Sequence, residues 1–400
     1  MNDAADPALR IDPKSPVRPI PPDSKRKKQV EAGMALCLSG GGYRAMVFHM
    51  GAIWRLHETG LMSTLKRISS VSGGSITAGV LGLKWDKLTG KPFERKNFER
   101  EFVAPLSALA RETIDVSSTA LGLVWPGGVS GRIAAAYDKY LFHGATLQNL
   151  PDEPRFVINA TNVQSGALWR FMKPYMADWR VGMVDKPEIS LASAVTASSA
   201  FPPVLSPMHM QLDPAAVREV DGNDLHTEPY ISNVVLSDGG VYDNLGLETA
   251  WKNYDTILVS DAGGHIKPEG KPSSNWALHS YRIFNLVDNQ VRALRKRQVI
   301  DSYKARPQDE NYRKGAYWGI RTDITHYELA DALEAPLQRT RALAAIPTRL
   351  ASMDKKTQAR LVNWGYAVCD AALRKHVDAS LGPKPVFPYI KYSSPTTDPG

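Results

Sequence analysis

The sequence contains only two cysteines among its 400 residues, and no cysteine or histidine spacing of the kind that ligates a metal. This excludes a disulfide framework, and we interpret Cys37 and Cys369 as buried apolar side chains. Long hydrophobic runs are also missing, since no stretch approaches the roughly 20 apolar residues of a membrane-spanning helix. The N-terminal residues lack the apolar segment of a secretory signal. We therefore expect a cytoplasmic protein that meets membranes only peripherally and needs neither a metal nor a cofactor.

The composition is that of a globular protein with a substantial core. Hydrophobic residues make up 43% of the chain and charged residues 22%, which excludes a disordered or fibrous protein. The net charge of +8 favours polyanionic partners such as anionic phospholipid or nucleic acid. Charge alone does not distinguish between the two.

Short apolar runs alternate with helical patterns through most of the chain. Strand-like runs occur at residues 34–38, 68–71, 155–160, 233–237 and 255–260. Buried strands that alternate with helices predict an α/β fold with a mainly parallel sheet covered on both faces. Residues 1–32 are rich in proline and charge and end in the basic run 25–28, which predicts a flexible basic arm. Residues 275–400 read as mainly helical, and we expect this C-terminal extension to pack on the same core.

Three consecutive glycines, Gly40, Gly41 and Gly42, join the first apolar run to a helical pattern. Glycines there let the backbone turn tightly and present several N–H groups at a helix N-terminus, where negative charge is favoured. The loop lacks the lysine and hydroxyl pair of a P-loop, and its spacing is not that of a dinucleotide-binding loop. We interpret it as a nest for an oxyanion or a phosphate, in preference to a plain turn.

Ser72 stands where a second apolar run meets a turn of small residues and a helix. This is the arrangement of a nucleophile elbow, in which a sharp turn exposes a serine hydroxyl at a helix N-terminus. Ser70 occupies the position where the usual elbow has glycine. Taken alone, the segment fits a serine- and glycine-rich linker equally well.

Two aspartates each follow an apolar run and stand just before a pair of glycines. Asp238 precedes Gly239 and Gly240, and Asp261 stands two residues before the second pair. A carboxylate at the end of a strand can take the proton of a serine hydroxyl. An Asp-Gly turn is the structural alternative, and spacing does not choose between the two aspartates.

Together, the glycine loop followed by Arg44, the serine elbow and the Asp-Gly-Gly segment resemble the patatin-like phospholipase family, in the family's order along the chain. Segments 159–166 and 194–202 also look similar to family sequences. The resemblance spans residues 34–247, roughly half of the chain. It implies a three-layer α/β/α catalytic domain, which we place at residues 33–274, and it selects Asp238 over Asp261.

The resemblance implies a serine-dependent lipid acyl hydrolase of phospholipase A type that works without a histidine. Ser72 and Asp238 would form its catalytic dyad, and the amides of the three loop glycines its oxyanion hole. The residues expected to support the site are Arg44, Gly74, Gly239 and Gly240. The implied partner is a phospholipid membrane surface, bound peripherally when the enzyme is active, and we expect no specific nucleic acid. Some bacterial relatives are effectors controlled by a nucleotide messenger, which adds a regulatory small molecule or nucleotide to the expected partners.

Two other functions fit the same segments. The chain is alternatively an esterase or thioesterase acting on soluble acyl substrates, or a non-catalytic regulatory protein whose glycine loop binds a phosphate or nucleotide. His49 and His265 are the alternatives to aspartate as the base, but neither has a distinctive context. We expect His49 to be a packed or helix-surface residue and His265 a turn residue.

A basic cluster lies on a predicted helix of the C-terminal part and comprises Arg292, Arg295, Lys296 and Arg297. Apolar residues of the same helix have the spacing of a buried stripe: Ile283, Leu286, Val287 and Leu294. A basic helix face is usually only solvated, but it can also rest on anionic headgroups or bind an acidic partner or a nucleotide.

Overall fold

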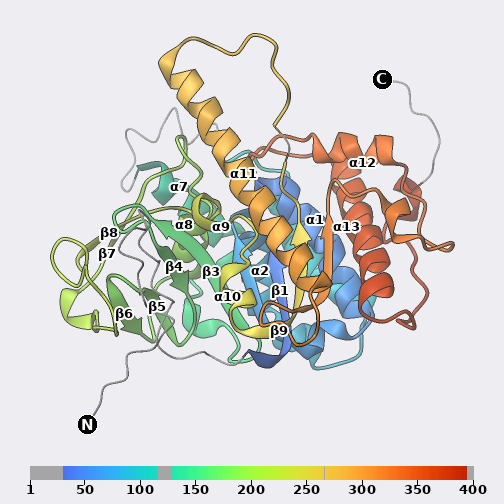
Figure 1. The fold of residues 1–400 in the computed structure, drawn as a ribbon, viewed down its shortest axis with the longest axis horizontal. Helices are drawn as coiled ribbons and strands as arrows, with labels where there is room; N and C mark the ends of the chain where they lie inside the picture. The colour runs from blue at the N-terminus through green and yellow to red at the C-terminus, as the bar shows by residue number, and fades with distance from the viewer. Residues whose placement is uncertain (1–29, 116–127, 265, 394–400) are drawn as a thin grey trace, which may run out of the picture.

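The structure is a computed structural model that describes residues 30–115, 128–264 and 266–393. Figure 1 shows a central sheet with helices on both of its faces. The three-layer α/β/α fold predicted from the sequence is therefore confirmed. The predicted arm at residues 1–32 lies outside the described residues, except for its last three positions.

The strands of the described residues form one sheet with a parallel centre. In spatial order, the parallel strands are β10 (Lys314–Gly319), β9 (Tyr254–Asp261), β1 (Glu31–Leu38), β2 (Leu65–Val71) and β3 (Arg155–Asn162). Beyond β3 the sheet continues with antiparallel pairs through β4 (Leu168–Phe171), β5 (Tyr175–Asp178) and β6 (Gly182–Asp185). Strand β8 (Asn233–Asp238) also pairs antiparallel with β3, and β7 (Met208–Gln211) pairs with β8.

Strand β8 is the one strand expected from the sequence that runs antiparallel to the parallel strands of the sheet. Hydrophobic patterning identifies a buried strand but not the direction in which it runs. Because β8 runs against β3, its last residue, Asp238, lies beside Ala160 of β3. This register places the aspartate at the carboxyl end of the parallel strands.

The helices divide between the two faces of the sheet. One face is covered mainly by α1 (Gly42–Glu58), α2 (Gly73–Leu83), α5 (Ala104–Leu109), α8 (Leu191–Ser198) and α13 (Lys355–His376), and the other by α9 (Gly240–Asp243), α10 (Glu248–Trp251) and α11 (Trp276–Lys304). The remaining helices are α3 (Trp85–Thr89), α4 (Arg95–Phe98), α7 (Gly128–Tyr137) and α12 (Leu337–Ala344). Each face of the sheet has its own hydrophobic core: the first core lies on the side of α1, and the second core on the side of α10 and α11. Successive residues of β1 point to opposite faces, so Leu36 and Leu38 pack into the first core while Ala35 and Cys37 pack into the second.

Helix α13 lies against α1, which ties the C-terminal residues to the N-terminal helix. A Cβ atom added to Gly51 or to Gly365 would lie 2.0 Å from a carbonyl oxygen of the facing helix, so glycine allows the two backbones to approach closely. Buried Arg55 pairs with Asp370 across this contact at 2.8 Å. Within the C-terminal part, β10 adds a strand that the mainly helical pattern had not indicated.

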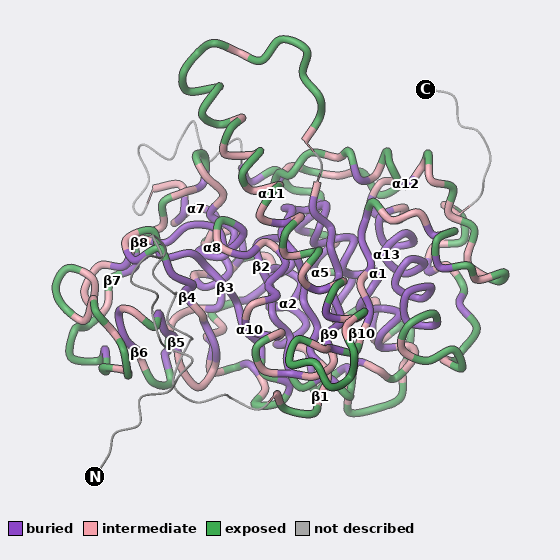
Figure 2. The backbone as a smooth tube through the Cα atoms, in the orientation of Figure 1, coloured by how far each residue is buried: buried purple, intermediate pink, exposed green. Residues whose placement is uncertain are grey.

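Helix α11 corrects one expectation from the sequence. The stripe predicted to be buried is exposed along its length: Ile283, Leu286, Val287 and Leu294. The opposite side of the helix faces the body: Asp288 lines a cavity there, Arg292 is buried, and Val299, near the C-terminal end, is fully buried in the second core. Its N-terminal half projects beyond the sheet, as Figures 1 and 2 show. Among the described helices, none combines the length and the apolar character needed to cross a membrane.

Candidate active site

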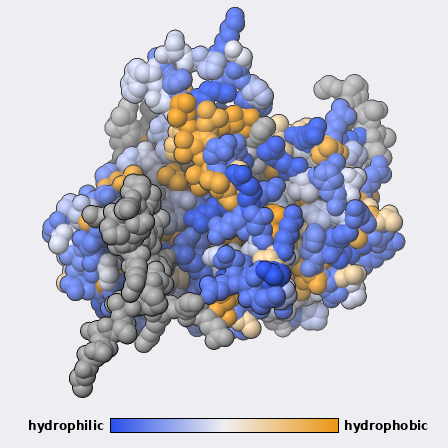
Figure 3. All heavy atoms as spheres, viewed as in Figure 1, coloured by the Kyte–Doolittle hydropathy of each residue, from blue (hydrophilic) through white to orange (hydrophobic). Residues whose placement is uncertain are grey.

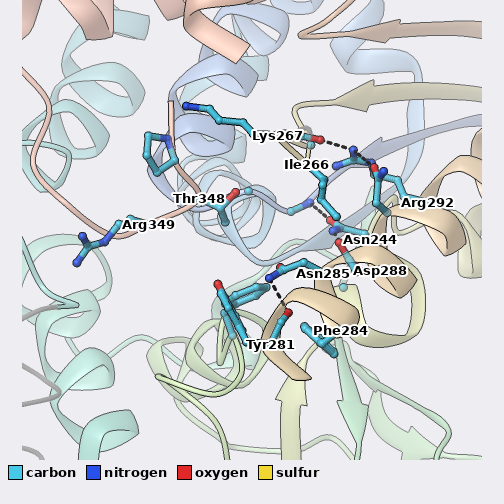
Figure 4. A pocket seen from close by; sticks show the side chains of 18 of the residues that line it. Asn244, Ile266, Lys267, Tyr281, Phe284, Asn285, Asp288, Arg292, Thr348 and Arg349 are labelled. Atoms are coloured by element: carbon cyan, nitrogen blue, oxygen red, sulfur yellow. Dashed lines mark hydrogen bonds between the residues drawn. The ribbon is translucent and has the colours of Figure 1, made fainter. Parts of the chain in front are cut away.

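A cavity of about 780 Å³ opens at the carboxyl ends of the parallel strands. Its wall includes Gly40, Gly41, Ser72 and Asp238, so the three predicted segments meet in one place. Figure 4 shows the side chains contributed by α11 and by the segments around residues 266 and 348. Helices α1 and α2 both begin beside the cavity, and helix N-termini favour negative charge.

Ser72 has the strained backbone expected of an elbow. Its φ is 52° and its ψ −123°, a conformation that residues other than glycine rarely adopt. The strain is held by tight packing behind the turn, since a Cβ added to Gly73 would lie 2.1 Å from the Gly42 carbonyl oxygen. The Ser72 amide donates to Ser198 Oγ at 2.9 Å. The hydroxyl is thereby left at the cavity wall, directly before the first turn of α2.

The glycine loop passes close to the elbow and has two free amides. Gly41 has a φ of 143° and Gly42 a φ of 60°, both in the region that favours glycine. The Gly40 amide donates to the side-chain and backbone oxygens of Asn244, each at 3.0 Å. The amides of Gly41 and Gly42 have no hydrogen-bond partner in the described part of the chain. Of the three loop amides, these two are therefore not engaged by another described residue; Gly41 lines the cavity, whereas Gly42, the next residue in the sequence, is buried and is not among the lining residues.

Arg44 braces the glycine loop from behind. Its side chain is buried and donates to the carbonyl oxygen of Ala262 at 3.1 Å, to Thr348 Oγ1 at 3.0 Å and to the carbonyl oxygen of Ile346. Burial and the nearby Arg292 lower the pKa of Arg44 to about 10, so the guanidinium stays charged at neutral pH. Because all its contacts described above run to neighbouring segments, Arg44 fixes the loop between them.

The sheet register places Asp238 and Ser72 on either side of strand β3. Val71 pairs with Asn159 of β3, so Ser72 follows at the level of Ala160, and Asp238 pairs with Ala160 from the other side. The two residues therefore flank one position of β3. Their side chains both reach the cavity wall.

The Asp238 carboxyl group is buried and only partly satisfied. Its Oδ1 accepts from the Gly240 amide at 2.7 Å, whereas Oδ2 has no hydrogen-bond partner among the described residues. Burial raises the pKa of Asp238 to about 7; the Gly240 amide and the Ser72 hydroxyl oppose this rise, and Asp288 adds to it. Ser72 is thus close enough to affect the charge of the carboxyl group, although no hydrogen bond of normal geometry joins them. A looser contact of this kind is common in sites without substrate.

The predicted supporting glycines stand where the backbone is crowded. A Cβ added to Gly74 would lie 2.4 Å from the Leu38 carbonyl oxygen, and one added to Gly239 would lie 2.3 Å from that of Asn159. At Gly240 it would lie 2.9 Å from the Asp238 carboxylate. A larger residue at any of these three positions would require the serine elbow or the aspartate to move.

Two of the alternative catalytic residues, Asp261 and His49, do not line the cavity that contains Ser72. Asp261 accepts from Tyr317 Oη at 2.6 Å and lines a separate cavity of about 230 Å³. His49 is fully buried, and its Nε2–H donates to the Ser39 carbonyl oxygen at 3.0 Å, so Nδ1 accepts from Ser260 Oγ at 2.8 Å. Burial lowers the pKa of His49 to about 4, which keeps the ring neutral. His265 lies outside the described residues.

The basic cluster of α11 is largely engaged within the protein. Buried Arg292 donates to the Gly264 carbonyl oxygen and to Asn289 Oδ1. Arg295 pairs with Glu248 at 3.0 Å, and the Lys296 ammonium group stands 4.6 Å from the centre of the Tyr317 ring. Only Arg297 of the four is exposed without such a contact in the described chain. The cluster is therefore not a free basic surface.

Sequence reasoning assigned no role to three residues that shape the site. Asn244 anchors the Gly40 amide, Ser198 anchors the Ser72 amide, and Asp288 of α11 faces the cavity near Asp238. Asn244 and Ser198 belong to segments that already resembled the family, so motif context could have singled them out. Asp288 had no such signal, since only the path of α11 brings it there.

Among the described residues, no group of three or more His, Cys, Asp or Glu side chains is placed to hold a metal ion. The sequence model of the patatin-like phospholipase family matches residues 36–251, and the chain belongs to this family.

No curated protein matches the sequence. Among solved structures, human GIVD cytosolic phospholipase A2 is 12% identical, with 86% of this chain and 62% of that chain covered and a TM-score of 0.47. VipD from Legionella pneumophila is 15% identical, with 87% and 67% covered and a TM-score of 0.36. This chain thus spans less than two thirds of the length of the human structure.

Proposed function

We propose that the chain is a phospholipase A-type hydrolase that cleaves carboxylic esters of membrane phospholipids through a dyad of Ser72 and Asp238. The observation that carries the proposal is the meeting of the two residues at one cavity, with a strained serine and a carboxylate oxygen that has no hydrogen-bond partner among the described residues. Family membership supports an acyl hydrolase, and the cavity supports this pair.

In the first step, Ser72 Oγ attacks the ester carbonyl carbon while the Asp238 carboxylate takes the hydroxyl proton. The free Oδ2 is the oxygen suited to accept it, because Oδ1 is held by the Gly240 amide. Collapse of the tetrahedral intermediate breaks the bond to the leaving alcohol, which takes the proton back from Asp238. Water then attacks the acyl-serine with Asp238 again as base, and the fatty acid leaves.

We assign the oxyanion hole to the amides of Gly41 and Gly42. The sequence had suggested all three loop glycines, but the Gly40 amide is held by Asn244 and serves to anchor the loop. Each oxyanion donor is commonly worth about 3 kcal/mol of transition-state stabilisation. Helix α1 begins at Gly42, and its positive N-terminus favours the same negative charge.

Two experiments test the assignment. A fluorophosphonate probe reacts with an activated serine, and we expect labelling of the wild type and of Ser70→Ala but not of Ser72→Ala. Ser70 is a matched control because it is buried in the adjoining strand and bonded to Val157 and Ser75. Labelling that survives in Ser72→Ala would sink the proposal.

The second experiment tests whether the pair acts as a unit. Alanine at Ser72 or at Asp238 should abolish hydrolysis to a similar extent, and the double variant should lose little more. Additive losses would separate the two residues. Comparison of vesicle lipid with a dispersed short-chain ester or thioester distinguishes the phospholipase from an enzyme for soluble substrates. A folded wild type without turnover on any of them would favour a non-catalytic, anion-binding role for the loop.

A further inference from the structure

The N-terminal half of α11 carries large apolar side chains that no core covers. We call residues 276–287 the α11 projection; its exposed apolar residues are Trp276, Leu278, Tyr281, Ile283, Leu286 and Val287. Trp276 is 80% exposed, and Figure 3 shows hydrophobic residues gathered over this helix on an otherwise mainly hydrophilic face. A contiguous apolar patch on a protein surface marks an interaction site more often than isolated apolar residues do.

The projection has two faces with different surroundings. Leu278, Tyr281 and Phe284 line the cavity that contains Ser72. Trp276, Ile283 and Val287 do not line it, and their helical spacing places them together on the opposite side of the helix. Apolar surface is therefore continuous from the outside of the projection, around the helix, into the candidate active site.

The charges around the projection suit a negatively charged partner. Between Trp276 and Val287 the helix contains no carboxylate. The preceding segment contributes exposed Lys267 and Lys271, and its Glu269 is already paired with Arg282 at 2.7 Å. We call Lys267 and Lys271 the basic border of the projection. An exposed aromatic and aliphatic surface with such a border is typical of segments that lie in the headgroup region of anionic bilayers.

We propose that the α11 projection docks the enzyme on anionic phospholipid bilayers and leads the ester from the bilayer into the cavity. The inference rests on the proposed function, because it takes the cavity to be the place where lipid is hydrolysed. A second copy of the chain is the other partner that an apolar helix could take. It is disfavoured because two projections would bring Lys267 and Lys271 of both copies together. The one carboxylate of the segment that contains these lysines, Glu269, is already paired with Arg282.

The test uses the full chain with the double substitution Ile283→Glu and Val287→Glu, which puts two charges on the outer face without altering a cavity residue. Binding is measured by co-sedimentation with vesicles of phosphatidylcholine containing phosphatidylglycerol. It is measured in a Ser72→Ala background, so that it does not depend on hydrolysis. We expect the double substitution to weaken binding at least about tenfold, because two aliphatic side chains can no longer enter the bilayer.

Val386→Glu with Ile390→Glu is the matched control. These residues are also exposed apolar side chains, at 56% and 65%, but they lie in the C-terminal segment near α13 and away from the cavity lining. The control should bind vesicles like the parent protein. Circular dichroism of all variants verifies that the helices are retained. Vesicles of phosphatidylcholine alone should bind the parent several-fold more weakly, since the basic border then has no anionic partner.

Three results would overturn the proposal: no binding by the parent protein, equal binding by the α11 variant, or equal loss in the control. A change from dimer to monomer in the α11 variant, with vesicle binding retained, would instead assign the face to contacts between copies. The proposed function fails separately, through the absence of Ser72-dependent turnover of a soluble ester. Protein with Ser72 intact should turn over that ester at a rate that the α11 substitutions leave unchanged.

Discussion

The pH dependence of the reaction is a direct consequence of where Asp238 lies. Burial raises the pKa of this carboxyl group to about 7, whereas an ordinary aspartate titrates near 3.8. A general base must be ionised before it can accept the serine proton, so kcat/KM should rise with pH through the pKa of the free enzyme. The raised pKa therefore moves the acid limb of the profile into the neutral range.

The size of the effect follows from the ionised fraction. With a pKa of about 7, roughly one Asp238 in ten is ionised near pH 6 and roughly nine in ten near pH 8, so kcat/KM should increase about tenfold over this interval. An aspartate with its ordinary pKa would be fully ionised throughout and would give a flat profile. The two expectations differ enough for steady-state kinetics to separate them.

The assay is kcat/KM for a neutral soluble ester from about pH 5 to pH 9, with the rate of fluorophosphonate labelling as a second readout of the same base. Asp288→Asn supplies the perturbation, because the nearby Asp288 carboxylate adds to the raised pKa of Asp238. Removal of the Asp288 charge should shift the acid limb of the profile to lower pH, while the introduced side-chain amide can still accept the hydrogen bond from Asn244. A profile that is flat between about pH 6 and pH 8 in folded protein, or a limb that Asp288→Asn shifts upward, would refute the reasoning.

The remaining predictions concern stability, the histidine and the oxyanion loop. Asp238→Asn should raise Tm relative to wild type by an amount that grows as pH rises from about 4 towards 7, because only the wild type must then bury a charge; an equal Tm difference at every pH would contradict this. His49→Gln should retain most catalysis but lower Tm, since two buried hydrogen bonds are lost, and a kinetic loss as large as that of Ser72→Ala would instead revive a histidine base. Gly42→Ala should reduce kcat about 100-fold or more with KM little changed, because its Cβ would lie 2.5 Å from the Arg349 carbonyl oxygen and displace a donor; full activity would exclude this amide from the oxyanion hole.

Local features of the catalytic segments could be predicted because they depend on neighbours in the sequence. Where a strand is followed by glycines and then a helix, the local sequence itself predicts a tight turn. The β1–α1 loop and the β2–α2 loop, which contains Ser72, both have this form. The strained φ of Ser72 follows from the same local pattern. What the residues alone left open was the choice between Asp238 and Asp261, because both follow strands and precede glycines. Pairing between distant strands decides which of them lies beside the serine, and sequence spacing contains no record of that pairing.

The hydrogen bonding of the Gly40 amide could not be predicted from the sequence for a similar reason. Three glycine amides in a row look equivalent in the sequence. The backbone and side chain of Asn244, more than 200 positions later in the chain, accept hydrogen bonds from one of them. A contact of that kind changes which donors are free without any change in the loop's own residues. The number of available oxyanion donors is therefore a tertiary property of the fold.

Helix α11 shows where hydrophobic periodicity ceases to predict burial. Ile283 and Val299 are similar side chains of one helix, yet the first is exposed and the second fully buried. The two residues lie on nearly opposite sides of the helix. The repeat specifies which residues share a face but not which face turns towards the body, and Leu294, on the same side as Ile283, is exposed although it lies in the C-terminal half of the helix. Because successive residues point to different sides of a helix, α11 supplies Asp288 to the cavity and Val287 to solvent. Adjacent residues can therefore be altered to test the chemistry and the docking surface independently, so a defect in vesicle binding need not be confused with a defect in the dyad.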